Sequence, residues 1–402
     1  MAVTTAAVVA TGAGAAAAEE GPVPLPGCPA LLVLGVQGTS ESSPTASPSA
    51  DSGMLGRMFA PMLAEGASVD RVYIPYPASF GGALGTGPGI DPFTSSTNQA
   101  RARLDATAAE IVDRCPHTQI AAAGYSGGAA VVSQFAQDIG AGIGPVPVDR
   151  VAAIALLSDP TRPAGTGPIP GLAGQASPNP PPGTDGTHTA HVRLSPVPGS
   201  GGIADLGTDF GALAGRVGEF CAAGDLACDA PGHAAALRTA AGLAAQADLR
   251  DPVTAAGSLA GAWGQTVTEA GNAVLMADVT VDPAGQVNYA PAQTVSQRLA
   301  EAADPRTPAA TAEQTQAAAD RVGQIVGAIA ADPLGQIPRL VNQIGVAVGA
   351  EIAANADLLN PATLWHYATV TVAHTGYGAN GQTDEAADWF AAASHDLAGN
   401  GQ

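Results

Sequence analysis

A serine flanked by glycines lies at the point where a strand pattern gives way to a helix pattern. The apolar run 119–124 leads into Gly124-Tyr125-Ser126-Gly127-Gly128, and helical periodicity follows at once over 128–139. A G-x-S-x-G turn between a strand and a helix is typical of a nucleophile elbow, which exposes its serine on a sharp turn. The start of the helix also directs free N–H groups toward a negatively charged oxygen. These residues predict that Ser126 is the nucleophile of an acyl transfer reaction.

Buried strands and amphipathic helices alternate around this turn. Continuous apolar runs, expected of strands covered on both faces, lie at 30–36, 69–76, 119–124, 151–157 and 217–220. Helical patterns lie between them at 54–65, 97–115 and 128–139. This alternation predicts an α/β fold with a central, mostly parallel sheet. A stretch rich in Gly and Pro, 160–202, is expected to form a long surface loop around one short strand.

The chain changes character after residue 229. Ala-rich segments at 233–247, 310–331 and 339–356 predict helices, and Asp-Pro steps at 251, 282, 304 and 332 predict their boundaries. The α/β style returns near the end, with an apolar run at 368–373, a Gly-rich loop and a helix at 383–397. We therefore expect a leader and linker (1–27), a core (28–229 and 363–402) and a helical insertion (230–362). The insertion is either a lid over the site or a structural appendage.

Composition limits the partners of this protein. The 402 residues include 35 Asp and Glu but only 15 basic residues, all of them Arg, so the net charge is −20. Such an acidic surface repels phosphate backbones and anionic headgroups, which excludes nucleic acid as a partner. After residue 18, no apolar run approaches the ~20 residues that a membrane span needs, so we expect no stable span. We expect a monomer.

The first eighteen residues and the cysteines both indicate export. The start is small and weakly apolar, with an A-x-A-like end at 16–18, as in a signal peptide, although the usual basic region is missing. The alternative is an Ala-rich disordered start. The four cysteines, at 28, 115, 221 and 228, show neither a C-x-x-C pair nor a metal-ligand spacing. Disulfides in an oxidising compartment are therefore expected, in a secreted or cell-surface protein with no metal and no cofactor.

Three segments together resemble the cutinase family of secreted serine esterases. Cys115-Pro116-His117-Thr118-Gln119-Ile120, leading to Gly124–Ala129, is similar to the family's C-P-x-T-x-[IL] and G-Y-S-Q-G-A segments. Cys28-Pro29-Ala30 running to Gln37-Gly38-Thr39-Ser40-Glu41 resembles its opening strand and R-G-[ST]-x-E loop, and 220–228 resembles its [FY]-C-x-x-G-D-x-x-C loop. The chain departs from the family at Gly127, where Gln is usual, and at Gln37, where Arg is usual.

The resemblance implies a fold and a set of site residues. The fold is the three-layer α/β/α hydrolase fold, here with an added helical insertion. The catalytic triad is Ser126, Asp225 and His374, the last in His374-Thr375-Gly376-Tyr377-Gly378, which resembles the family's H-x-x-Y-G. The oxyanion hole consists of the backbone N–H groups of Thr39 and Gly127. The implied disulfides are Cys28–Cys115 and Cys221–Cys228.

Alternatives remain for two of these roles. Asp159, at the end of a strand pattern, is a second candidate for the acid. His233, which follows Asp225 closely, is the alternative base, and His366 is interpreted as a packing residue beside Trp365 and Tyr367. Surface positions are expected for His117, His188, His191 and His395.

We interpret the chain as a serine esterase, cutinase-like or lipase-like, that hydrolyses carboxylic esters through an acyl-enzyme. An acyltransferase with the same triad and a catalytically silent lipid-binding surface protein are the alternatives.

Overall fold

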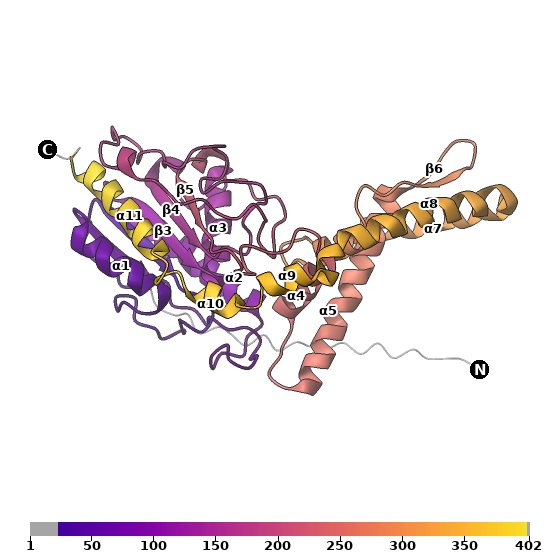
Figure 1. Cartoon of the computed structure of the whole chain (residues 1–402), viewed down its shortest axis with the longest axis horizontal. Coiled ribbons are helices and arrows are strands. Elements are labelled where there is room, and N and C mark those ends of the chain that lie inside the picture. The colour runs from indigo at the N-terminus through magenta and orange to yellow at the C-terminus, as the bar shows by residue number, and fades with distance from the viewer. Residues whose placement is uncertain (1–22, 400–402) are drawn as a thin grey trace.

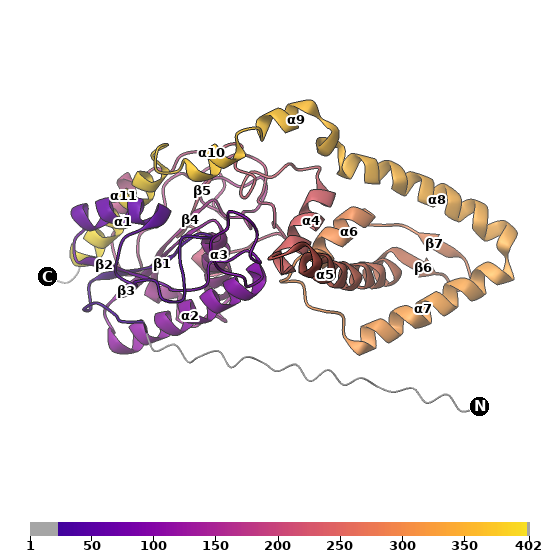
Figure 2. The ribbon, with the colours of Figure 1, turned by 90° about the horizontal axis from the view of Figure 1, so that it is seen from below.

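The computed structural model describes residues 23–399, so the part of the expected leader at 1–22 lies outside the described residues. Five strands form a parallel sheet in the order β2-β1-β3-β4-β5 (Figures 1 and 2). The strands are β1 (Leu31–Val36), β2 (Val69–Tyr73), β3 (Gln119–Tyr125), β4 (Val151–Leu157) and β5 (Val217–Phe220). Every residue of β1, β4 and β5 is buried, as their apolar runs predict. The predicted α/β fold with a parallel sheet is confirmed.

Helices cover both faces of the sheet, which makes three layers. Helices α1 (Gly53–Glu65) and α11 (Gln382–Gly399) pack together on one face, and α2 (Phe93–Arg114) and α3 (Gly127–Gly140) pack on the other (Figures 1 and 2). Successive side chains of a strand point to opposite faces. Accordingly Leu31 and Val33 join the core under α1 and α11, whereas Leu32 and Leu34 join the core under α2 and α3.

The long loop after β4 contains no strand within the described residues, contrary to our expectation for 160–202. A short 3-10 helix, Thr189–His191, lies there instead. The many prolines of this segment lack the N–H that a strand donates to its neighbour, which explains the absence of a ladder. Parts of the loop are nonetheless buried, including Arg162 and Ile169.

The segment between β5 and α11 is mainly helical. Its elements are α4 (Ala235–Gln246), α5 (Pro252–Ala273), a π turn (Val274–Asp278), the antiparallel strands β6 (Val279–Val281) and β7 (Val287–Tyr289), α6 (Val295–Ala303), α7 (Ala312–Ala331), α8 (Pro333–Ala354), a 3-10 turn (Ala356–Leu359), α9 (Pro361–His366) and α10 (Val370–Thr375). The Asp-Pro steps mark boundaries as predicted, because Asp251 and Asp332 accept backbone hydrogen bonds at the starts of α5 and α8. Of the apolar run 368–373, residues 370–373 lie in α10 and the first two belong to the turn before it.

The two ends of this helical segment meet. The backbone N–H of His233 donates to Oδ2 of Asp357 (2.8 Å), and that of Ala236 donates to Oδ1 of Asn355 (2.8 Å). Beyond this neck, α7 and α8 extend away from the sheet (Figures 1 and 2) and expose apolar side chains, among them Leu334, Val341 and Ile352. None of the described helices is long and apolar enough to cross a membrane.

Candidate active site

Ser126 lies on a strained turn between β3 and α3. Its φ of 54° and ψ of −120° are unusual for a residue with a side chain. The turn is possible because its neighbours are glycines: a Cβ on Gly128 would lie 2.0 Å from the carbonyl oxygen of Val36, and one on Gly124 would lie 2.5 Å from that of Gly128. The serine itself is partly exposed. The local geometry is therefore that of a nucleophile elbow.

Thr39 and Gly127 bring two unused N–H groups to this turn. Among residues 23–399, no acceptor takes the backbone N–H of either residue. The two residues are adjacent, because a Cβ on Gly127 would lie 3.2 Å from Oγ1 of Thr39. Free N–H groups beside a nucleophile are suited to stabilising a developing oxyanion.

Glu41 fixes the loop that carries Thr39. Its carboxylate accepts hydrogen bonds from the backbone N–H groups of Gly38 (3.2 Å) and Met54 (3.0 Å). Burial raises the pKa of this carboxyl above its ordinary value, and the two hydrogen bonds oppose that rise. Glu41 thereby ties the Thr39 loop to the start of α1.

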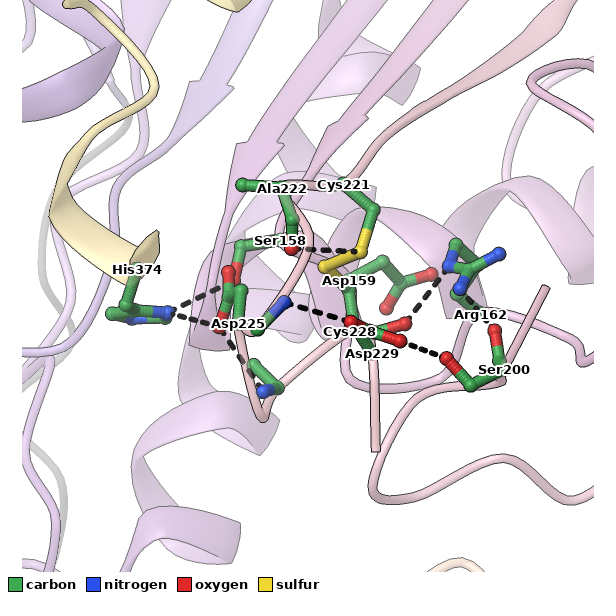
Figure 3. The surroundings of a disulfide bond; sticks show 12 residues. Ser158, Asp159, Arg162, Ser200, Cys221, Ala222, Asp225, Cys228, Asp229 and His374 are labelled. Carbon is green, nitrogen blue, oxygen red and sulfur yellow. Dashed lines mark hydrogen bonds and ion pairs between the residues drawn. A yellow bond between two sulfur atoms is a disulfide. The ribbon is translucent and has the colours of Figure 1, made fainter. Parts of the chain in front are cut away.

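The structure places His374 against Asp225. Nδ1 of His374, at the end of α10, lies 2.8 Å from Oδ1 of Asp225 in the loop after β5 (Figure 3). The imidazole is 31% exposed, whereas the carboxylate is fully buried. The hydroxyl of Tyr125, the residue before Ser126, donates to the carbonyl oxygen of His374 at 2.6 Å. The histidine is thus connected to the elbow through the residue next to Ser126.

Several donors surround the Asp225 carboxylate. Oδ1 also accepts the backbone N–H of Ala227 (3.1 Å), and Oδ2 accepts the hydroxyl of Tyr377 (2.7 Å). Burial by itself would raise the pKa of Asp225, but the hydrogen bond and the charge interaction with His374, together with hydrogen bonds from Ser158 and Tyr377, outweigh it and lower the pKa below its usual value. Asp225 is therefore held as an anion facing the imidazole.

Both disulfides occur in the pairing that the resemblance implies. Cys28 joins Cys115, and Cys221 joins Cys228. The second closes the loop that carries Asp225 (Figure 3). A short cross-linked loop has few conformations, so the carboxylate keeps its place at the edge of the sheet.

The sequence analysis missed a second serine at this site. Oγ of Ser158, the first residue after β4, lies 3.1 Å from Nδ1 of His374 (Figure 3). No motif marks Ser158. Its position directly after the apolar run 151–157 could have indicated it, because the carboxyl ends of neighbouring parallel strands meet at one edge of the sheet.

A second His–Asp pair supports the same loop. Nε2 of His366 lies 3.0 Å from Oδ2 of Asp229, which also accepts the backbone N–H of Gly224 at 2.7 Å. The hydroxyl of Tyr367 donates to the carbonyl oxygen of Asp229 at 2.6 Å. Our interpretation of His366 as a packing residue therefore misses its polar contact with the Asp225 loop.

The other candidates lie apart from this pair. His233 is exposed, with Nδ1 3.6 Å from Asp357, and the Asp159 carboxylate bonds to Thr161. Burial raises the pKa of Asp159 to about 6.

Two further contacts are absent within residues 23–399. In this part of the chain, no hydrogen bond joins Ser126 to His374, and no three His, Cys, Asp or Glu side chains gather as metal ligands.

Comparisons with known proteins identify a family that this chain resembles. The family model described as Cutinase matches residues 27–241. A carboxylesterase Culp6 homolog from Corynebacterium glutamicum is 32% identical over 230 residues, which are 53% of this chain and 69% of that protein. Among solved structures, the catalytic core of acetyl xylan esterase from Trichoderma reesei is 19% identical, with a TM-score of 0.33 over 58% of this chain and 99% of its own. A cutinase-like protein from Cryptococcus sp. is 18% identical, with a TM-score of 0.33 over 50% of this chain and 80% of its own.

Proposed function

The chain belongs to the cutinase family and is a carboxylic ester hydrolase, and we propose that it acts through a triad of Ser126, His374 and Asp225. The observation that carries this proposal is the 2.8 Å contact between Nδ1 of His374 and Oδ1 of Asp225, at the sheet edge that also holds the Ser126 elbow. Neither Asp159 nor His233 makes a comparable contact.

We propose the following reaction for these groups. Oγ of Ser126 attacks the ester carbonyl while Nε2 of His374 takes its proton, and Asp225 stabilises the imidazolium through Nδ1–H. The N–H groups of Thr39 and Gly127 receive the negative oxygen of the tetrahedral intermediate. The imidazolium then protonates the leaving alcohol. Water, activated by the same base, hydrolyses the acyl-enzyme and restores Ser126.

The two disulfide bonds are consistent with export of the protein. Disulfides persist in oxidising compartments and are rare in the cytosol, and this chain contains two. We therefore place the enzyme outside the cell or at its surface, with the Ala-rich start as its export signal.

We also propose that residues 28–229 and 363–402 form the catalytic core and that 230–362 form an insertion beside the site. The neck between His233 and Asp357 supports this division. Close to that neck, the backbone N–H of Leu249 donates to the carbonyl oxygen of Gly81 at 2.6 Å, and Thr94 donates to the carbonyl oxygen of Ala245 at 2.9 Å. Gly81 follows Phe80, whose ring contacts that of Phe93 beside Gly127. We call Phe80 and Phe93 the apolar rim of the site, and the insertion supports this rim.

Replacing the nucleophile tests the proposed triad. Ser126→Ala is expected to lower the turnover of short p-nitrophenyl esters by about 10⁴- to 10⁶-fold, the usual cost of losing a triad member. The melting temperature should stay within a few degrees of wild type, because the replaced hydroxyl is partly exposed. Activity within tenfold of wild type in a folded variant contradicts the proposal.

A further inference from the structure

Ser158 adopts a backbone conformation that a residue with a side chain rarely takes. Its φ is 59°, in the left-handed region that favours glycine. The residue is completely buried at the end of β4, and its backbone N–H donates to the carbonyl oxygen of Phe220 at 2.9 Å. Strain of this kind persists where the surrounding structure or a function requires it. A glycine would meet the backbone requirement without that cost, so the side chain of Ser158 needs an explanation.

The hydroxyl of Ser158 contacts the imidazole that is paired with Asp225. Oγ is 3.1 Å from Nδ1 of His374 (Figure 3). Against the rise that burial alone would cause, a hydrogen bond from Ser158 is among those that lower the pKa of Asp225. The hydroxyl therefore contacts His374 directly and also influences the carboxylate of Asp225.

The contacts of His374 decide which ring nitrogen carries the hydrogen when Asp225 is ionised. Nδ1 of a neutral imidazole carries a single hydrogen, and the closer acceptor is Oδ1 of Asp225 at 2.8 Å. The hydroxyl of Ser158 then presents a lone pair to Nδ1–H, and its own hydrogen is left for Asp225 or for the hydroxyl of Tyr377, the two other groups with which it interacts. This arrangement leaves Nε2 without a hydrogen, which is the form of His374 that can accept the proton of Ser126.

We infer that Ser158 is a positioning residue that holds His374 in the tautomer and orientation that the reaction needs, and that the strained backbone is retained for this hydroxyl. The inference rests on the proposed function, because it assigns Ser158 a role toward the proposed base. Within residues 23–399, no hydrogen bond joins Ser158 to Ser126, whereas its hydroxyl contacts His374, so it acts through His374.

Two variants separate the effect of losing the Ser158 hydroxyl from the effect of relieving the backbone strain. Ser158→Ala removes the hydroxyl and keeps the unfavourable backbone, whereas Ser158→Gly removes both. We expect kcat for a short p-nitrophenyl ester to fall about 10- to 100-fold in each, since a hydrogen bond to a charged group is lost. KM should change by less than twofold. Ser158→Gly should melt at a higher temperature than Ser158→Ala, so that the more stable variant is still a poor catalyst.

The pH profile of kcat/KM distinguishes a positioning role of Ser158 from a general loss of structure around the site. Without the hydroxyl, the Nδ1–H of the imidazolium loses the lone pair of Ser158, so the protonated form of His374 is less stabilised and the acid limb of kcat/KM should move to lower pH in both variants. If Ser158→Gly retains wild-type kcat and an unmoved acid limb, Ser158 has no positioning role. A lower kcat with an unmoved limb also overturns the inference, because it indicates a structural effect.

A labelling control keeps the two proposals distinguishable. If a fluorophosphonate modifies the wild-type enzyme at Ser126 but the Ser158 variants are fully active, only the role of Ser158 is refuted. Failure of the proposed function would instead appear as ester hydrolysis that survives Ser126→Ala.

Discussion

The hydroxyl of Tyr377 lies 2.7 Å from Oδ2 of Asp225, the carboxylate oxygen that His374 does not contact. Tyr377 is fully buried and follows His374 by three residues, so one short segment supplies both the imidazole and a second hydrogen-bond donor for its partner. The tyrosine of the H-x-x-Y-G segment is therefore part of the support for the catalytic acid that we propose.

Removing this hydroxyl should weaken the fold in a pH-dependent way. The pKa of Asp225 is lowered in the folded protein, so Asp225 stabilises the fold above its unfolded value of about 3.9 and loses that contribution as the pH falls through the folded value. Tyr377→Phe should therefore cost about 1–3 kcal/mol at pH 7 and less at pH 3. Thermal melts across this range measure the difference.

Tyr367→Phe is the matched control for Tyr377→Phe. It removes a hydroxyl that donates to the uncharged carbonyl oxygen of Asp229. Its stability loss should be similar at both pH values. If the two variants show the same pH dependence, Tyr377 does not act on the charge of Asp225.

The choice between Asp225 and Asp159 has a direct test. Asp225→Asn should lower kcat about 10⁴-fold, because an amide cannot stabilise the imidazolium or hold the correct tautomer. Asp159→Asn should leave kcat within a few-fold of wild type. The opposite ranking of the two variants would assign the acid to Asp159.

Asp159→Asn should also change the pH dependence of stability. Because burial raises the pKa of Asp159 to about 6, ionisation of Asp159 destabilises the fold as the pH rises from about 3.9, the unfolded value, to about 6. Asparagine does not ionise. The melting temperature of the variant, relative to wild type, should therefore rise between pH 4 and pH 6 and then level off, by an amount equivalent to roughly 3 kcal/mol. A difference in melting temperature that does not change with pH would contradict the ionisation of a buried Asp159.

Phe93 explains why a glycine at 127 suits this chain. A Cβ there would lie 2.8 Å from the Phe93 ring and 3.2 Å from Oγ1 of Thr39. Gly127→Gln should therefore displace one of these groups and lower kcat/KM, and Phe93→Ala in the same chain should restore part of the loss. Ala130→Gln, on the same helix, is the control for added bulk. Strictly additive effects of Gly127→Gln and Phe93→Ala would show that the ring does not limit residue 127.

Deleting residues 237–354 tests the role of the insertion, because the ends of this deletion already meet. The variant loses the contacts that α4 and Leu249 make with the rim. Each methylene that loses burial costs ~0.8 kcal/mol, so the preference for long over short acyl chains should change severalfold. The rate ratio for p-nitrophenyl esters of increasing chain length is the measurement. An unchanged ratio in a folded, active variant makes the insertion an appendage.

The parts of the structure that could be predicted depend on local patterns. The buried strands follow from apolar runs, and the positions of Ser126, Asp225 and His374 from motifs that each lie within a few residues. His366 and Asp229 could not be paired in advance, because they are 137 residues apart and belong to no motif. The strands of the β6–β7 hairpin have only three residues each, too few for a periodic signal. Helix α8 begins at Pro333 rather than Arg339 because Pro333 fits the first helical position, while Pro338 is tolerated inside the helix.

Mapping the site of covalent modification tests the central claim most directly. The wild-type enzyme is treated with a fluorophosphonate, and the modified residue is located by peptide mass spectrometry. We predict a single adduct on Ser126, formed slowly in His374→Ala and at the wild-type rate in His233→Ala, because only His374 is paired with Asp225. An adduct on another residue, or no adduct on an enzyme that hydrolyses esters, would contradict the assignment of Ser126 as the nucleophile.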